Sequence, residues 1–433
     1  NTAVGYQAGY SNTTGDNLTS VGTTAGYSNT TGRFNTNLGK NAGYSNQTGA
    51  NNTTVGNGAG SANTADSLTA VGSNAANANT SGADNVAIGK EALTRNTTGA
   101  SIVAVGKNAL AFNTTASNNT AVGYQSLYAN TTGDSLTAVG YQALKASTGV
   151  NNTAVGYNAF TATTTGVHNA GLGRAAGLSN TTGSYNTAIG DAALPFNTTA
   201  SNNTAVGYQS LYTNTTGESN VAIGLKAMYS NTTASNNIAV GYQALELNTT
   251  GGANAALGLQ ALENNTTGAN NIALGFRALQ ANTTANNNTA VGYRASHDNT
   301  TGTRNVSMGK DAMYQTTTGS DQVGIGYEAL TRNTTGANNV AIGKETLSRN
   351  TTGNHNVAVG YEAGYSNTTG TNNTVIGRDA GYSNQTADGN VFIGEYAGRS
   401  TTNSNNTFLG TSSGWQVTSG QKNTILGRYN GNQ

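Results

Sequence analysis

The sequence contains no cysteine, one proline and one tryptophan, and only 9% of its 433 residues are charged. The absence of cysteine excludes disulfides and thiolate metal sites but does not decide the redox compartment. With 19 basic and 18 acidic side chains, the chain lacks the positive surface that nucleic-acid binding requires. No apolar run approaches the roughly 20 residues that cross a bilayer, and no signal peptide is present. We therefore expect no nucleic-acid partner and no membrane insertion of this segment.

The most regular feature of the sequence is a glycine that follows an aliphatic residue, which we call the marker glycine. It occurs 26 times, from Gly5 to Gly427, and successive copies lie 17 residues apart except for three steps of 16. A fixed period of this length decides the architecture of a chain. The sequence predicts one continuous array over residues 1–433 with no second domain. Because Asn1 lies in mid-repeat, we expect the array to be part of a longer chain.

A short alternating stretch precedes each marker glycine, as in Val86, Ala87 and Ile88. Alternation with period two predicts a strand with one buried face. Since the residue before the marker glycine is always Val, Ile, Leu or Met, we expect it to fill the core. A second apolar segment follows the glycine, with Ala in most copies and then Leu, Met or Gly, and we expect a second strand there. Gly is used in the first four and last five copies, which predicts slimmer or more tightly packed ends.

The two segments are separated by Asn-Thr-Thr-Gly, as in residues 130–133. Asn caps turns with its side chain and Gly supplies a positive φ, so this motif predicts a turn. Two strands and two turns per repeat indicate an all-β parallel β-solenoid of about 26 coils, stacked at roughly 4.8 Å. Equivalent side chains then form ladders, such as Tyr124, Tyr141 and Tyr157. Because the core of one coil is thin, we expect several chains to share apolar faces, most simply as a homotrimer.

Several repeats carry a resemblance to a known family. The stretches "NNTAVG", "DNVAIGKEAL" and "NNVAIGKETL" resemble the head repeat of trimeric autotransporter adhesins, and "NNTAVGYQSLYANTTG" looks like repeats of phage-type tail-fibre proteins. The resemblance covers all 26 repeats, although the adhesin-head repeat is shorter. It implies a left-handed parallel β-roll, three chains per fibre, and a role in attachment at a cell surface or on a virion.

The sequence offers no catalytic constellation. Paired carboxylates, a Ser-His-Asp arrangement, a phosphate loop and the Gly-Asp repeats of calcium-binding rolls are absent. The three histidines, His168, His297 and His355, are interpreted as surface residues because no two of them fall in one coil. We therefore expect no enzyme, no cofactor and no metal site.

The turn motif also matches the N-glycosylation sequon in 19 of the 25 complete copies. This pattern indicates either an array of glycan acceptors or an asparagine-capped turn, and we favour the turn. The candidate acceptors are Asn12, Asn29, Asn96, Asn113, Asn130, Asn180, Asn214, Asn265, Asn333 and Asn367. Tyrosine ladders offer a second candidate surface, for stacking sugar rings, although we favour a role in spacing the coils.

These patterns favour a structural fibre shaft of an extracellular appendage, on a cell or a virion, that supports surface attachment. Its expected partner is a further copy of itself, and a carbohydrate or host-surface receptor is the candidate ligand. The alternative is a self-assembling extracellular filament subunit, with or without a glycan coat, that has no receptor site of its own. A receptor site should interrupt the ladders, whereas a pure filament should keep them intact.

Overall fold

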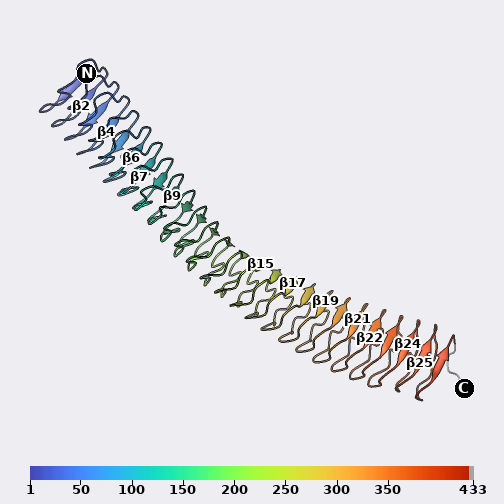
Figure 1. Cartoon of the computed structure of the whole chain (residues 1–433). Coiled ribbons are helices and arrows are strands. Elements are labelled where there is room, and N and C mark those ends of the chain that lie inside the picture. The colour runs from blue at the N-terminus through green and yellow to red at the C-terminus, as the bar shows by residue number, and fades with distance from the viewer. Residues whose placement is uncertain (429–433) are drawn as a thin grey trace. The chain divides into compact units, whose positions relative to one another are not determined.

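A computed structural model describes residues 1–428 of the chain, so the last five residues of the predicted array lie outside the described residues. The chain divides into two compact units, Asn1–Glu218 and Ser219–Gln433. Each unit is a stack of coils with one strand per coil (Figure 1). The described residues contain no helix. The predicted all-β parallel β-solenoid with a 17-residue repeat is therefore confirmed.

All strands contain three residues. The strands of the first unit are β1 (Thr2–Val4), β2 (Thr19–Val21), β3 (Thr36–Leu38), β4 (Thr53–Val55), β5 (Thr69–Val71), β6 (Val86–Ile88), β7 (Val103–Val105), β8 (Thr120–Val122), β9 (Thr137–Val139), β10 (Thr153–Val155), β11 (Ala170–Leu172), β12 (Thr187–Ile189) and β13 (Thr204–Val206). The strands of the second unit are β14 (Val221–Ile223), β15 (Ile238–Val240), β16 (Ala255–Leu257), β17 (Ile272–Leu274), β18 (Thr289–Val291), β19 (Val306–Met308), β20 (Val323–Ile325), β21 (Val340–Ile342), β22 (Val357–Val359), β23 (Thr374–Ile376), β24 (Val391–Ile393), β25 (Thr407–Leu409) and β26 (Thr424–Leu426).

Within each unit, every strand pairs in parallel with the strand of the next coil, and the partners are equivalent residues of successive repeats. Ala121 of β8 lies opposite Ala138 of β9, and Val122 lies opposite Val139. Strands β20 and β21 of the second unit keep the same register. The backbone therefore winds once per repeat, as the period predicts, and equivalent side chains stack on one another.

The segment after the marker glycine is not a strand, so the prediction of two strands per coil is wrong. This segment consists of turns in which alternate residues take left-handed angles, such as Gln125 with φ 53° and Leu127 with φ 49°. Such angles lie outside the β region. Each left-handed non-glycine residue costs about 1 kcal/mol, which the burial of a leucine, worth about 1.5–3 kcal/mol, offsets.

The strand face that we expected to be buried points towards the surface. The middle residue of each strand, which we call the inner strand position, is the buried one, and Ala87 is fully buried. The residue before the marker glycine is half-buried or exposed and in no strand buried, with 39% of Ile88 and 52% of Leu172 accessible. Alternation shows that neighbours point to opposite faces, but it does not show which face is inside. The prediction that these aliphatic residues fill the core is therefore wrong.

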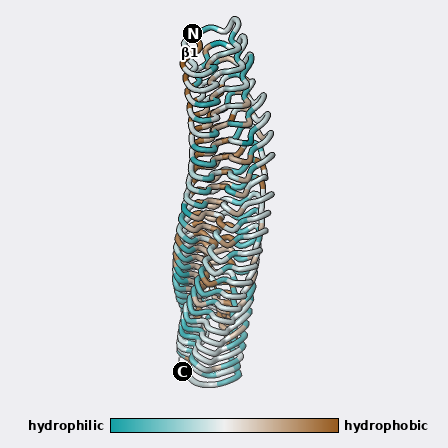
Figure 2. Tube along the Cα trace, turned by 90° about the vertical axis from the view of Figure 1, so that its left-hand side faces the viewer, coloured by the Kyte–Doolittle hydropathy of each residue, from teal (hydrophilic) through white to brown (hydrophobic). Residues whose placement is uncertain are grey.

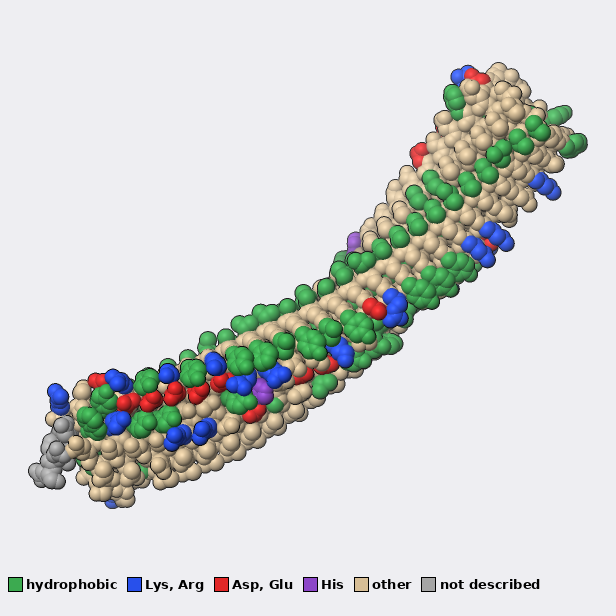
Figure 3. Space-filling model, turned by 180° about the vertical axis from the view of Figure 1, so that it is seen from behind, with side chains coloured by type: hydrophobic (Ala, Val, Ile, Leu, Met, Phe, Trp, Pro, Cys, Tyr) green, Lys and Arg blue, Asp and Glu red, His purple; other side chains and the backbone are tan. Residues whose placement is uncertain are grey.

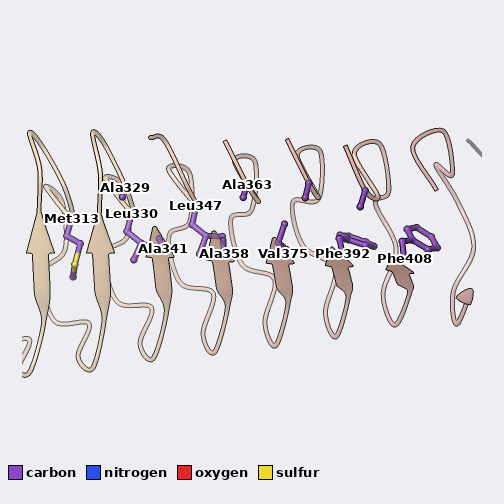
Figure 4. Close-up of a cluster of buried hydrophobic side chains, with 12 residues drawn as sticks. Met313, Ala329, Leu330, Ala341, Leu347, Ala358, Ala363, Val375, Phe392 and Phe408 are labelled. Carbon is purple, nitrogen blue, oxygen red and sulfur yellow. The ribbon is translucent and has the colours of Figure 1, made fainter. Parts of the chain in front are cut away.

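The core of each coil is formed by the inner strand position and by the residue four after the marker glycine, which we call the inner turn position. The sizes of the two compensate each other. Phe392 on the strand packs where Gly398 occupies the turn, and a Cβ on that glycine would lie 2.6 Å from the ring (Figure 4). Phe408 and Gly414 repeat this arrangement. The copies with Gly381, Gly398 and Gly414 are therefore filled from the strand side rather than slimmer.

Candidate functional site

The asparagine of the Asn-Thr-Thr-Gly turn, which we call the turn asparagine, points into the coil. The side chain of Asn130 is fully buried. Its Nδ2 donates to the carbonyl oxygen of Gly133 at 3.0 Å and to Oδ1 of Asn113 in the preceding coil at 3.2 Å. Its Oδ1 accepts from the backbone N–H of Gly133 at 2.9 Å. The turn asparagine thus caps its own turn and also joins neighbouring coils.

The same geometry holds for the predicted glycan acceptors. Of the ten, Asn12 is half-buried and the other nine are buried. Their Nδ2 atoms donate to carbonyl oxygens of their turns, as in Asn29, Asn180, Asn265 and Asn367. A glycan on Nδ2 would displace these hydrogen bonds, and the folded coil has no room for it beside the buried amide. The geometry therefore supports the asparagine-capped turn that we favoured.

A second column of buried asparagines lies four residues before the marker glycine. Asn119 donates from Nδ2 to the carbonyl oxygen of Gly133 at 2.9 Å, and its Oδ1 accepts from the N–H of Leu136 at 2.8 Å. Asparagines therefore form ladders in the interior of the coil, beside the apolar core. An asparagine recurs four residues before the marker glycine in nearly every repeat, and this recurrence was the sequence signal that the position is structurally required.

The predicted tyrosine ladders are confirmed. Tyr124, Tyr141 and Tyr157 stack with ring centroids 5.3 and 5.0 Å apart and interplanar angles of 17° and 9°. Tyr10, Tyr27 and Tyr44 stack in the same way. Because the faces of stacked rings contact one another, the inner rings of a ladder offer only their edges to a ligand. This geometry supports the role in spacing the coils that we favoured over sugar stacking.

The strands present an uncharged face of aliphatic and threonine side chains to the outside. We call the first and last residues of each strand the outer strand positions. The last residue is Val, Ile, Leu or Met in all 26 strands, and the first is Thr, Val, Ile or Ala. Apolar positions accordingly recur coil after coil in Figure 2, and rows of apolar side chains follow the surface in Figure 3. No charged residue interrupts this face in any strand of the described residues.

The second unit carries a row of carboxylates that repeats from coil to coil. Its members stand two residues after successive marker glycines and are Asp311, Glu328, Glu345, Glu362 and Asp379. The hydrogen bond with Glu362 raises the pKa of Tyr361 to about 12, and Glu328 raises the pKa of Tyr327 in the same way. Basic side chains form ion pairs with three members of the row, Asp311, Glu345 and Asp379. Arg294 Nε, for example, lies 2.8 Å from Asp311 Oδ1.

Two of the three histidines lie against aromatic rings. His168 stacks on Tyr185, and His297 stacks on Tyr314 with Nδ1 2.6 Å from Asp298 Oδ1. In that part of the chain, no group of three or more His, Cys, Asp or Glu side chains is arranged to hold a metal ion.

No helix among the described residues is long and apolar enough to cross a membrane. No protein-family model matches the chain, and no curated protein sequence is significantly similar to it.

Proposed function

We propose that the chain is a structural segment of an extracellular fibre, on a cell surface or a virion, which self-associates through its outer strand positions and supports attachment. The observation that carries this proposal is the uncharged outer face of the strands, on which every strand places an aliphatic residue at its last position. The largest apolar patch on a typical soluble monomer measures about 300–600 Å². An aliphatic residue ends each of the 13 strands of each unit, and an apolar first residue accompanies it in 12 of the 26 strands, so this row recurs over the whole length of a unit.

The thin interior of the coil also favours association. Each coil buries only a few small apolar residues, as in Ala104 on the strand with Ala109 and Leu110 opposite it. Conformational ordering costs about 1–2 kcal/mol per residue of backbone, so further apolar burial between chains would add stability where the single chain has little. Identical faces make self-association the simplest way to cover the aliphatic residues.

A left-handed homotrimer is the assembly that the resemblance to adhesin heads favours. Three strand faces meeting around one axis would remove the aliphatic side chains from water and leave the Asn-Thr-Thr-Gly turns outside. The alternative function, a filament subunit without a receptor site, uses the same assembly. The two functions differ only in whether the outer surface holds a ligand.

The test of self-association places charge on the strand face of neighbouring coils. The variant combines Val122→Lys with Val139→Lys, and the matched control combines Thr115→Lys with Thr132→Lys on the exposed turn. Burying unpaired ammonium groups at an interface costs several kcal/mol. Light scattering after size-exclusion chromatography should show three chains for the wild type and the control, and one chain for the face variant. A monomeric wild type, or a face variant that remains trimeric with an unchanged β circular-dichroism signal, would contradict the proposal.

A further inference from the structure

Three hollows in the surface occur at one place in the repeat. On one side stands the residue two after the marker glycine, which we call the first wall, and on the other stand the residues five and six after it, which we call the second wall. One hollow, of about 460 Å³, lies between Thr24 and Asn41 on the first wall and Tyr44 and Ser61 on the second. Another, of about 220 Å³, lies in the second unit between Arg294, Asp311 and Glu328 and, opposite them, Tyr314 and Arg332.

The third hollow, of about 300 Å³, has the most varied chemistry. Its first wall is formed by Asn74, Glu91 and Asn108, and its second wall includes Arg95, Phe112 and Tyr128. These residues come from four successive coils, so the hollow is about 14 Å long at the spacing of neighbouring strands.

The backbone explains why a hollow forms between the two walls. Ala92 and Leu93, which lie between Glu91 and Thr94, are fully buried because the left-handed angles of Glu91 and Leu93 turn these side chains into the core. The floor of the hollow is therefore main chain, while the first and second walls stand up on either side. The same conformation in each coil makes the hollow a property of the fold, and the wall residues determine what it binds.

Two aromatic rings meet on the second wall of this hollow, at repeat positions other than the one that carries Tyr124, Tyr141 and Tyr157. Phe112 and Tyr128 meet at 71°, with ring centroids 4.8 Å apart, whereas the rings of the tyrosine ladder at Tyr141 and Tyr157 are within 9° of parallel. Two rings at 71° cannot both direct their faces along the stack, so at least one turns its face sideways. The guanidinium of Arg95 lies 4.1 Å from the centroid of Phe112. The hollow thus combines a guanidinium that covers one face of Phe112 with a second ring turned across the first, an arrangement that the parallel tyrosine stacks do not offer.

The opposite wall supplies hydrogen-bonding groups. Asn74 and Asn108 each offer an amide donor and an acceptor, and Glu91 offers carboxylate oxygens. Amide and carboxylate groups on one side with aromatic and guanidinium groups on the other suit a sugar, which has hydroxyl groups at its edge and C–H groups on its face. The first unit has seven basic and seven acidic side chains, so the surroundings do not favour a polyphosphate. A peptide strand would need a free sheet edge, and neighbouring coils occupy the edges of β6, β7 and β8.

We propose that the hollow between Asn74, Glu91 and Asn108 and the facing Arg95, Phe112 and Tyr128 binds a linear oligosaccharide that lies along the stack of coils. The advance of one coil, roughly 4.8 Å, is close to the length of one sugar in an extended β-linked chain, so successive sugars meet successive wall residues. The site holds about three sugars at that spacing. This inference rests on the proposed function for its biological role, because it gives the attachment surface a ligand class, but it does not require self-association.

The chain contains a natural control for this site. Phe196 and Tyr212 occupy the same two repeat positions as Phe112 and Tyr128 and also meet at a right angle, 88°. The first-wall residues beside them, Ala175 and Ala192, carry no polar group, unlike Glu91 and Asn108. An aromatic pair without a polar wall should not bind the sugar.

The experiment measures binding of cello-oligosaccharides, chito-oligosaccharides and oligogalacturonates to the full chain by calorimetry and saturation-transfer NMR. At least one of these probes should bind the wild type. Phe112→Ala and Glu91→Ala should each weaken that binding about tenfold or more, and Phe196→Ala should leave it unchanged. The inference is overturned if no probe binds, if Phe112→Ala and Glu91→Ala bind like the wild type, or if Phe196→Ala loses binding equally. Binding that persists in a monomeric Val122→Lys, Val139→Lys variant supports the sugar site even where the self-association proposal fails.

Discussion

At the scale of single residues, the interior of this solenoid depends on asparagine as much as on apolar side chains. The turn asparagine of one coil donates to the Oδ1 of the turn asparagine before it, as Asn113 does to Asn96 at 2.8 Å. A buried amide of this kind stabilises the fold only while its partners are present, because a buried polar group without a partner costs about 1–3 kcal/mol. The ladder is therefore most vulnerable where asparagine is replaced.

Such replacements occur naturally and leave hydroxyl groups without partners. Ser147, Thr163, Thr316 and Thr401 take the place of the turn asparagine, and within residues 1–428 the side-chain oxygen of each is buried with no hydrogen bond. In the coil before Thr316, Oδ1 of Asn299 is also buried without a partner. The shorter threonine has no N–H to offer it, so the ladder is broken at this point.

Restoring the ladder at this point should stabilise the protein. We expect Thr316→Asn to raise the free energy of unfolding by about 1 kcal/mol, because the new Nδ2 donates to Oδ1 of Asn299. Urea denaturation of the full chain measures the change. The control is Thr318→Asn on the exposed side of the same turn, which should stay within about 0.5 kcal/mol of the wild type. A Thr316→Asn variant no more stable than this control would show that the ladder does not carry stability from coil to coil.

At the scale of the coil, stability depends on complementary sizes across a thin core. Phe160 at the inner turn position extends its ring into the next coil, where the two facing core positions are both glycine. A Cβ on Gly171 of the strand would lie 2.5 Å from the ring, and one on Gly177 of the turn would lie 2.4 Å from it. Leu194 holds the inner turn position of the following coil at a similar left-handed angle. The backbone at Gly177 therefore accepts a leucine, and the ring of Phe160 excludes it.

This explanation predicts a coupled effect of two substitutions. Gly177→Leu should destabilise the chain by about 1–3 kcal/mol through overpacking, and Phe160→Ala by about 3–5 kcal/mol through the cavity it leaves. The double variant should be more stable than the sum of the two single changes implies, because the new leucine occupies the vacated space. A double-mutant cycle by urea denaturation measures the coupling. Strictly additive changes would indicate that the glycine is required for its φ angle instead.

The sequence period determines which residues stack on one another, but it does not determine which face of a strand is buried. The spacing of the marker glycines predicts parallel coils and stacked tyrosines, because a strict repeat places equivalent residues together. The triplet Val86, Ala87, Ile88 does not reveal which face is buried, because both phases of an alternation contain apolar residues. Ala87 is small and buried because Leu93, at the inner turn position, fills the core opposite it. The wall hollows were not predicted, since they arise from left-handed angles at residues such as Glu91 that have no glycine to signal them.

At the scale of the whole molecule, the array keeps its register although its repeat is not constant. The 16-residue step from Gly56 to Gly72 still places Thr53 opposite Thr69. Asn63 donates to the carbonyl oxygen of Ala65 two residues on, whereas Asn130 donates to Gly133 three residues on. The missing residue is therefore the second threonine of the turn, which is exposed in complete copies. A coil that lacks this residue gives up the hydrogen bond that its N–H makes to the next coil, as Thr98 makes to Thr114 at 3.2 Å, but keeps the register of its strand.

This observation predicts that two single-residue deletions in one coil differ sharply. Deletion of Thr132 should leave the free energy of unfolding within about 0.5 kcal/mol of the wild type, as expected for a surface change. Deletion of Ala121 should destabilise the chain by more than about 3 kcal/mol, because a one-residue slip in β8 turns an outer side chain into the core and exposes the next one. Excision of the whole coil from Gly123 to Val139 serves as the control, since it rejoins Val122 to a marker glycine and each coil contacts only its neighbours. Thermal unfolding followed by circular dichroism compares the three, and equal losses for the two single deletions would mean that the turns, and not the strand faces, set the register of the array.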